Sequence, residues 1–132
     1  MASRCCCATL APMRGVWSTG WRCGIAGCNR VISRDRSKGR AYVADVLREA
    51  DRVAPLFAAG RPVAQLHLGG GTPNFLTPDL LEELMEGLRQ RFTLVDADWR
   101  DYSIELDPRT VTPEDVATLA RLGFNRASLG IQ

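Results

Sequence analysis

Residues 63–73 run an apolar strand directly into three glycines, a threonine and a proline, and this feature constrains the fold most. Gly69, Gly70 and Gly71 lack a Cβ atom, so a ligand can approach their peptide groups closely. Pro73 fixes its own φ angle and favours an extended conformation for the residue before it. Parallel α/β proteins bind small molecules at such loops, at the carboxyl end of a strand. A tight turn without a ligand needs one glycine, so three in succession favour a binding loop.

The chain after residue 40 alternates between helical and strand patterns. Apolar residues recur at intervals of three and four in the helical segments, and threonine-proline pairs begin two of them. The predicted helices span residues 41–58, 78–92 and 113–122, and the predicted strands span residues 63–68, 102–106 and 126–131. Because helices and strands alternate with short connections, we predict an α/β fold with a parallel sheet.

The first 40 residues show neither periodicity, so we predict an irregular segment over residues 1–40 and an α-β-α-β-α-β unit over residues 41–132. Five basic residues between positions 30 and 40 are interpreted as part of a solvated linker. The pattern stops at residue 132 without the helix that should follow the third strand. The chain is therefore expected to be the front part of a larger barrel or open sheet.

Composition argues against several classes of partner. The 17 basic and 15 acidic residues leave a formal charge of +2, which gives no general case for a nucleic-acid or membrane partner. No apolar run reaches the roughly 18 residues of a membrane helix, and residues 1–11 do not form a signal peptide pattern. All five cysteines lie in the first 28 residues, unlike a disulfide framework, so we predict a cytoplasmic protein.

Polar or glycine-rich residues stand at the ends of all three predicted strands. In a parallel barrel these ends lie on one rim, where active sites gather. Glu105 interrupts an apolar stretch, and burying a carboxylate is costly unless it is paired or hydrogen-bonded. A structural and a functional interpretation stay open at this point. In the structural one, Glu105 is a partly exposed residue of an edge strand, or it pairs with Arg109. In the functional one, it accepts a hydrogen bond from a ligand amine or sugar hydroxyl.

Three other groups are interpreted structurally. Asp107 precedes a proline and is expected to shape a turn. His67 is the single histidine, so a core histidine bonded to a neighbour is expected rather than a metal ligand. Cys23 and Cys28 match no common zinc spacing, and an iron–sulfur cluster needs three or four thiolates at short intervals. Spacing alone therefore predicts no metal cluster.

Four motifs, taken in order, resemble the oxygen-independent coproporphyrinogen III oxidases, radical S-adenosylmethionine (SAM) enzymes of haem biosynthesis. The motifs are Gly-Cys28-Asn-Arg-Val-Ile-Ser-Arg-Asp-Arg-Ser, Gln65-Leu-His-Leu-Gly-Gly-Gly-Thr-Pro73, Ser103-Ile-Glu-Leu-Asp-Pro-Arg109 and Gly123-Phe-Asn-Arg-Ala-Ser-Leu-Gly-Ile-Gln132. Gly-Gly-Gly-Thr-Pro occurs across radical SAM proteins, whereas the combination is much more specific. The resemblance covers residues 28–132.

This resemblance implies the front part of a radical SAM (β/α)6 partial barrel and a [4Fe–4S] cluster that reductively cleaves SAM. In the family, the resulting radical takes hydrogen from the propionates of coproporphyrinogen III, which leave as CO2 and give the vinyl groups of protoporphyrinogen IX. The family binds two SAM molecules. By motif position, Gly70 and Glu105 would contact the first SAM, and Gly71, Thr72 and Gln132 the second.

The cysteine motif departs from the family pattern Cys-x-x-x-Cys-x-x-Cys-x-Cys, in which the first three cysteines bind iron. Cys23 is nearest to the third ligand, and Cys28 matches the fourth cysteine, which is not a ligand. The first two ligands would fall at Val16 and Gly20, which cannot bind iron. We therefore expect a fragment with a disrupted cluster motif, no assigned catalytic residue and no independent catalysis. A reading-frame error before Cys28 and a true variant would each produce this pattern.

Two alternative functions stay open. One is another radical SAM activity, as in a haem chaperone-like relative, although such relatives usually lack the Cys28-Asn-Arg segment. The other is a module that binds SAM or haem without chemistry. The resemblance implies a porphyrinogen as small-molecule substrate and does not identify an electron donor.

Overall fold

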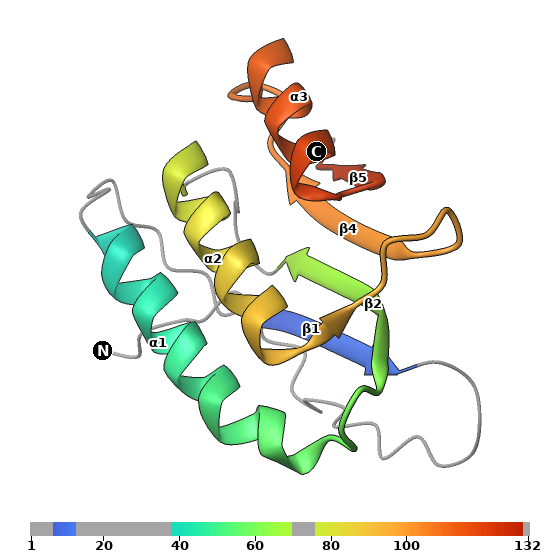
Figure 1. Ribbon diagram of the computed structural model, residues 1–132. Coiled ribbons are helices and arrows are strands. Elements are labelled where there is room, and N and C mark those ends of the chain that lie inside the picture. The colour runs from blue at the N-terminus through green and yellow to red at the C-terminus, as the bar shows by residue number, and fades with distance from the viewer. Residues whose placement is uncertain (1–6, 13–37, 70–75, 131–132) are drawn as a thin grey trace.

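The computed structural model describes residues 7–12, 38–69 and 76–130. Its strands are β1 (Cys7–Pro12), β2 (Pro62–Gly69), β3 (Thr93–Leu94), β4 (Asp101–Leu106) and β5 (Arg126–Leu129). Its helices are α1 (Lys38–Val53), the short 3-10 helix η1 (Ala54–Leu56), α2 (Pro78–Arg91) and α3 (Pro113–Leu122). Figure 1 shows α1 and α2 side by side in front of β1 and β2, and α3 next to β4 and β5.

The sheet confirms the predicted α/β fold. Strands β2, β4 and β5 are adjacent and parallel, and the two-residue β3 also pairs with β2 in parallel. The register places Leu68 beside Ile104 and Leu106 beside Leu129. The carboxyl ends of β2, β4 and β5 therefore lie at the same edge of the sheet, as the sequence predicted.

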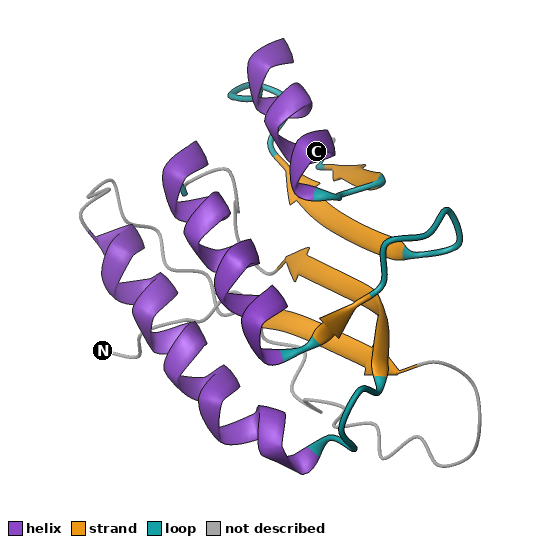
Figure 2. Cartoon of the chain, viewed as in Figure 1, coloured by secondary structure: helices purple, strands orange, loops and turns teal. Residues whose placement is uncertain are grey.

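The core lies between the helices and one face of the sheet (Figure 2). Alternate residues of β4 point into it, because successive side chains of a strand face opposite sides. Helix α2 contributes a stripe at helical spacing. The buried hydrophobic residues of β2, α2 and β4 are Val63, Ala64, Leu66 and Leu68 from β2, Leu80, Leu81, Leu84, Met85 and Leu88 from α2, and Tyr102, Ile104 and Leu106 from β4.

Helix α1 ends earlier than the pattern predicted. It spans Lys38–Val53, whereas the apolar periodicity predicted a helix to residue 58. Pro55 explains the difference, since proline has no N–H and its ring clashes with the carbonyl one turn earlier. The chain forms η1 at this proline instead of a further α-helical turn.

The expected threonine caps differ between the other two helices. Thr77 precedes Pro78 in the extended conformation of an N-cap, but its side chain makes no capping hydrogen bond. Thr112 does cap α3: its hydroxyl accepts from the Asp115 amide at 3.2 Å, and the Asp115 carboxylate accepts from the Thr112 amide at 2.9 Å. This capping box fixes the start of α3 directly after the loop from β4.

Two strands are additional to those predicted. The segment interpreted as irregular contains β1, which pairs with β2 in antiparallel orientation and brings Cys7 beside Gly69. β3 follows α2 immediately and is too short to give a sequence pattern. The division of the chain near residue 40 into two parts stays a prediction.

Gly123 ends α3 in the left-handed region, with φ at 100°. A Cβ atom there would meet no atom closer than 3.6 Å, so backbone strain rather than crowding opposes substitution. We expect Gly123→Ala to lower the free energy of unfolding by about 1–2 kcal/mol, measured by urea denaturation. Gly123→Asn should lose less, because asparagine tolerates this conformation better. Equal stability of Gly123→Ala and the unchanged protein would contradict the left-handed conformation of Gly123.

Candidate functional site

The face of the sheet opposite the helices carries polar side chains from three adjacent strands, and we call it the polar sheet face. In β4 the buried residues alternate with partly exposed ones, so the latter point away from the core. The register places His67 beside Ser103 and Glu105 beside Ser128. The polar sheet face consists of Gln65, His67, Asp101, Ser103, Glu105, Arg126 and Ser128.

His67 connects the two central strands of this face. Its Nδ1 atom lies 2.8 Å from the Ser103 Oγ atom, a hydrogen bond whose donor depends on the tautomer. Its Nε2 atom lies 3.6 Å from the Glu105 Oε1 atom. The His67 and Glu105 side chains are 40% and 44% exposed, so water or a ligand can reach both.

The interpretation of His67 is confirmed in one part and wrong in another. It is bonded to a neighbour, as expected, but it is half-exposed rather than a core residue. The reason is strand alternation: Leu66 and Leu68 point into the core, so the residue between them points to the polar sheet face.

Gly69 lies directly against this pair. A Cβ atom at Gly69 would stand 2.3 Å from the His67 Nε2 atom and 2.9 Å from the Glu105 Cδ atom. No side chain larger than hydrogen fits there without movement of the imidazole. Gly69, His67 and Glu105 therefore gather at the carboxyl ends of β2 and β4, which is the rim expected from the sequence.

The possible pairing of Glu105 with Arg109 is wrong. Arg109 instead forms a two-pronged ion pair with Asp107, with its Nε atom 2.9 Å from Oδ1 and its Nη2 atom 2.6 Å from Oδ2. The Arg109 amide also donates to Oδ1 at 3.0 Å, and the Thr110 amide donates to the Asp107 carbonyl at 3.1 Å. Asp107 thus shapes the turn after β4, as expected, and in doing so it engages the arginine.

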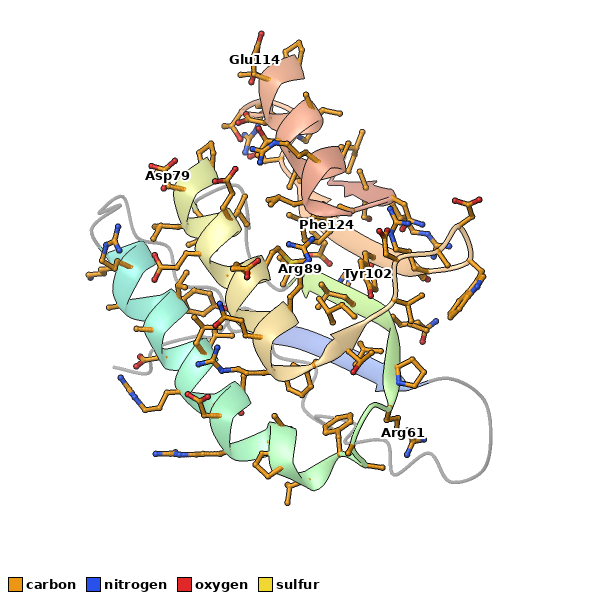
Figure 3. The ribbon with its side chains drawn as sticks, in the orientation of Figure 1. Arg61, Asp79, Arg89, Tyr102, Glu114 and Phe124 are labelled. Atoms are coloured by element: carbon orange, nitrogen blue, oxygen red, sulfur yellow. The ribbon has the colours of Figure 1, made fainter. Side chains whose placement is uncertain are left out.

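Arg109 lowers the pKa of the Asp107 carboxyl group from 3.8 to about 2, chiefly through the side-chain hydrogen bonds. The ion pair therefore stabilises the fold above the ordinary pKa, and this contribution disappears as the pH falls towards 2. We expect Arg109→Gln to raise the pKa of Asp107 towards its ordinary value, measured by NMR titration of the carboxyl carbon. Arg61→Gln, at an exposed arginine elsewhere (Figure 3), should leave it unchanged. An unchanged pKa in Arg109→Gln would contradict the pairing.

The remaining site predictions fall outside the residues that the structure describes. These are Gly70, Gly71, Thr72 and Gln132 for SAM, and Cys23 for iron. Within the described ranges, no group of three or more histidine, cysteine, aspartate or glutamate side chains could hold a metal ion. Among the same residues, no helix has the length and apolar character to cross a membrane.

Ser103 and Gly69 are site residues that sequence reasoning did not assign. Ser103 lies in a quoted motif, and its position two residues before Glu105 places both on one face of a strand. Gly69 was interpreted as a loop residue open to a ligand, whereas it ends β2 and makes room for the two side chains above it.

The chain resembles known proteins over most of its length. The oxygen-independent coproporphyrinogen III oxidase of Pseudomonas aeruginosa is 46% identical over 110 residues, which cover 83% of this chain and 24% of that protein. The protein of the same name from Escherichia coli is 42% identical, covering 83% of this chain and 23% of that one. No family model matches the chain.

One solved structure shares the fold. It is described as coproporphyrinogen III oxidase from Escherichia coli, a radical SAM enzyme, and it superposes with a TM-score of 0.73 at 40% identity. The match covers 80% of this chain and 24% of that one. The chain thus spans about a quarter of the length of the relatives it matches. In sequence and fold, most of this chain is therefore similar to about a quarter of an oxygen-independent coproporphyrinogen III oxidase.

Proposed function

We propose that the rim around Gly69 and Glu105 binds SAM, as part of the scaffold of an oxygen-independent coproporphyrinogen III oxidase. The observation that carries the proposal is the half-exposed Glu105 carboxylate at the carboxyl end of β4, directly against Gly69. SAM presents an ammonium group, ribose hydroxyls and a sulfonium cation. A carboxylate accepts hydrogen bonds from the first two and attracts the positive charges.

The residues of the rim fit such a ligand. The small Gly69 keeps the end of β2 free of a side chain, and the next two glycines continue the motif. Gly70 would join Glu105 at the first SAM by motif position. Gly71, Thr72 and Gln132 would contact the second by the same argument.

Whether this chain can hold the [4Fe–4S] cluster of the family is separate from whether it binds SAM. In that family the cluster supplies the electron that cleaves SAM. The sequence leaves Cys23 alone at a ligand position, and the described residues offer no replacement group of ligands. These residues do not fit a cluster held by three thiolates, so no step of the proposal runs through one.

The names of the relatives support a proposed activity. The relatives are coproporphyrinogen III oxidases by name, which supports coproporphyrinogen III as the proposed substrate of the whole enzyme. The motif resemblance implies oxidative decarboxylation of its propionates to vinyl groups as that enzyme's reaction. We propose that this chain is an inactive fragment of such an enzyme, because it lacks two of the cluster ligands. We also propose a cytoplasmic location, which the clustering of all cysteines near the N-terminus supports. The identity of 46% to an oxidase favours this function over a chaperone-like relative.

Equilibrium dialysis of SAM against the full 132-residue chain tests the proposal. We expect saturable binding, and we expect Glu105→Gln to weaken it about tenfold or more, because a hydrogen bond to a charged group contributes about 1.5–3 kcal/mol. Glu114→Gln is the matched control, since Glu114 lies at the exposed start of α3 (Figure 3). Absence of saturable binding, or equal affinity of Glu105→Gln and the unchanged chain, would overturn it.

A further inference from the structure

We propose that His67, oriented by Ser103, is a positioning residue that fixes the Glu105 carboxylate for SAM. The inference rests on the proposed function of Glu105 and adds two residues to it. Three observations carry it: a hydrogen bond between His67 and Ser103, a contact between His67 and Glu105, and the space left by Gly69.

Ser103 sets the orientation of the imidazole ring. Its Oγ atom lies 2.8 Å from His67 Nδ1 and 3.4 Å from the carbonyl oxygen of Leu66, and its single proton can be donated to only one of these atoms at a time. The shorter distance favours the bond to the ring. Both partners stand on adjacent parallel strands with fixed register. The ring is therefore held by the sheet, and its other nitrogen is directed towards Glu105.

The position of the Glu105 carboxylate favours one tautomer of the ring. Nε2 lies 3.6 Å from Oε1, so a bare Nε2 would place two acceptors opposite each other. The favoured tautomer carries its proton on Nε2 and accepts the Ser103 hydroxyl at Nδ1. In this tautomer an N–H faces the carboxylate and restrains it.

The space left by the missing side chain of Gly69 independently supports the contact between His67 and Glu105. The Nε2 atom stands 2.3 Å from the place where a Cβ atom of residue 69 would lie. Gly69 does not have a positive φ angle, so its backbone conformation does not require glycine. Glycine is required at this position because the His67 imidazole and the Glu105 carboxylate occupy the space that a side chain of residue 69 would fill.

The contact is compatible with a bound ligand. A carboxylate offers about four acceptor positions on its two oxygens, so His67 can restrain one oxygen while a ligand bonds elsewhere on the group. At 3.6 Å the contact is longer than a hydrogen bond. Contacts of this kind often tighten only in the complex.

A double-mutant cycle on SAM affinity tests the inference with the full chain. We expect His67→Ala to weaken binding about fivefold in the unchanged background but less than about twofold in the Glu105→Gln background, because the two side chains act as a unit. His67→Gln, whose side-chain amide can still donate towards Glu105, should retain more affinity than His67→Ala. Equal weakening in both backgrounds, or none in either, would overturn the inference.

The ring nitrogens of His67 provide a readout that does not require SAM. His67 is the single histidine, so its 15N signals are unambiguous. We expect Glu105→Gln and Ser103→Ala each to change these shifts, and the control Glu114→Gln to leave them unchanged. If the 15N chemical shifts of the His67 ring are the same in Glu105→Gln as in the unchanged chain, the inference is overturned. A ring that responds in a chain that does not bind SAM would refute the proposed function alone and leave the pairing standing.

Discussion

Leu84→Ala is expected to lower the free energy of unfolding by about 2–5 kcal/mol. Leu84 is 1% exposed and lies in the middle of α2, within the core between the helices and the sheet. Truncation removes buried methyl groups and leaves a cavity, because close-packed neighbours relax only in part. Urea denaturation followed by far-UV circular dichroism measures the change.

The chain offers a matched control for this experiment. Leu56→Ala makes the same chemical change at a leucine that is 81% exposed. Its effect should stay within about 0.5 kcal/mol, as for most surface substitutions. Equal losses in the two variants would show that the helices do not cover the sheet in the arrangement described.

Gly69→Ala is expected to affect stability and binding together. Its methyl group would lie 2.3 Å from His67 Nε2, so the ring must rotate and give up its hydrogen bond to Ser103. Overpacking of this kind costs about 1–3 kcal/mol in stability. We also expect a loss of SAM affinity of about fivefold, as for His67→Ala, measured by equilibrium dialysis, because the displaced ring no longer restrains Glu105.

The double variant His67→Ala/Gly69→Ala separates crowding from other effects. Without the imidazole, the nearest atoms to the added methyl group among those described belong to the flexible end of Glu105, with Cδ at 2.9 Å. Gly69→Ala should therefore cost less stability in the His67→Ala background than alone. Equal costs in both backgrounds would contradict the reason given for a glycine at this position.

Local patterns predicted most of the elements. The alternation around Ile104 predicted β4, and the capping threonine and terminal glycine predicted the ends of α3 at Thr112 and Gly123. These signals are local and have a direct physical cause in side-chain direction and backbone conformation. The end of α1 was predicted too late, because the apolar spacing continued past a proline that interrupts the hydrogen bonds.

The site was predicted only in part. The motif identified Glu105 and the glycine loop, and the structure brings Glu105 against Gly69. The contact between His67 and Ser103 joins residues 36 positions apart, so it depends on strand register, which one sequence does not reveal. Arg109 illustrates the same limit: proximity in sequence suggested Glu105 as its partner, whereas the turn after β4 presents it to Asp107.

We propose that the carboxyl ends of β2, β4 and β5 bind SAM together. Titration of SAM into the 15N-labelled chain, followed by backbone amide NMR, tests this most directly. We expect saturable shifts at Gly69, Glu105 and Ser128, with little change at Val43 in α1, whose side chain is buried in the core. Saturable shifts confined to other parts of the chain, or no shifts at Gly69 and Glu105, would contradict it.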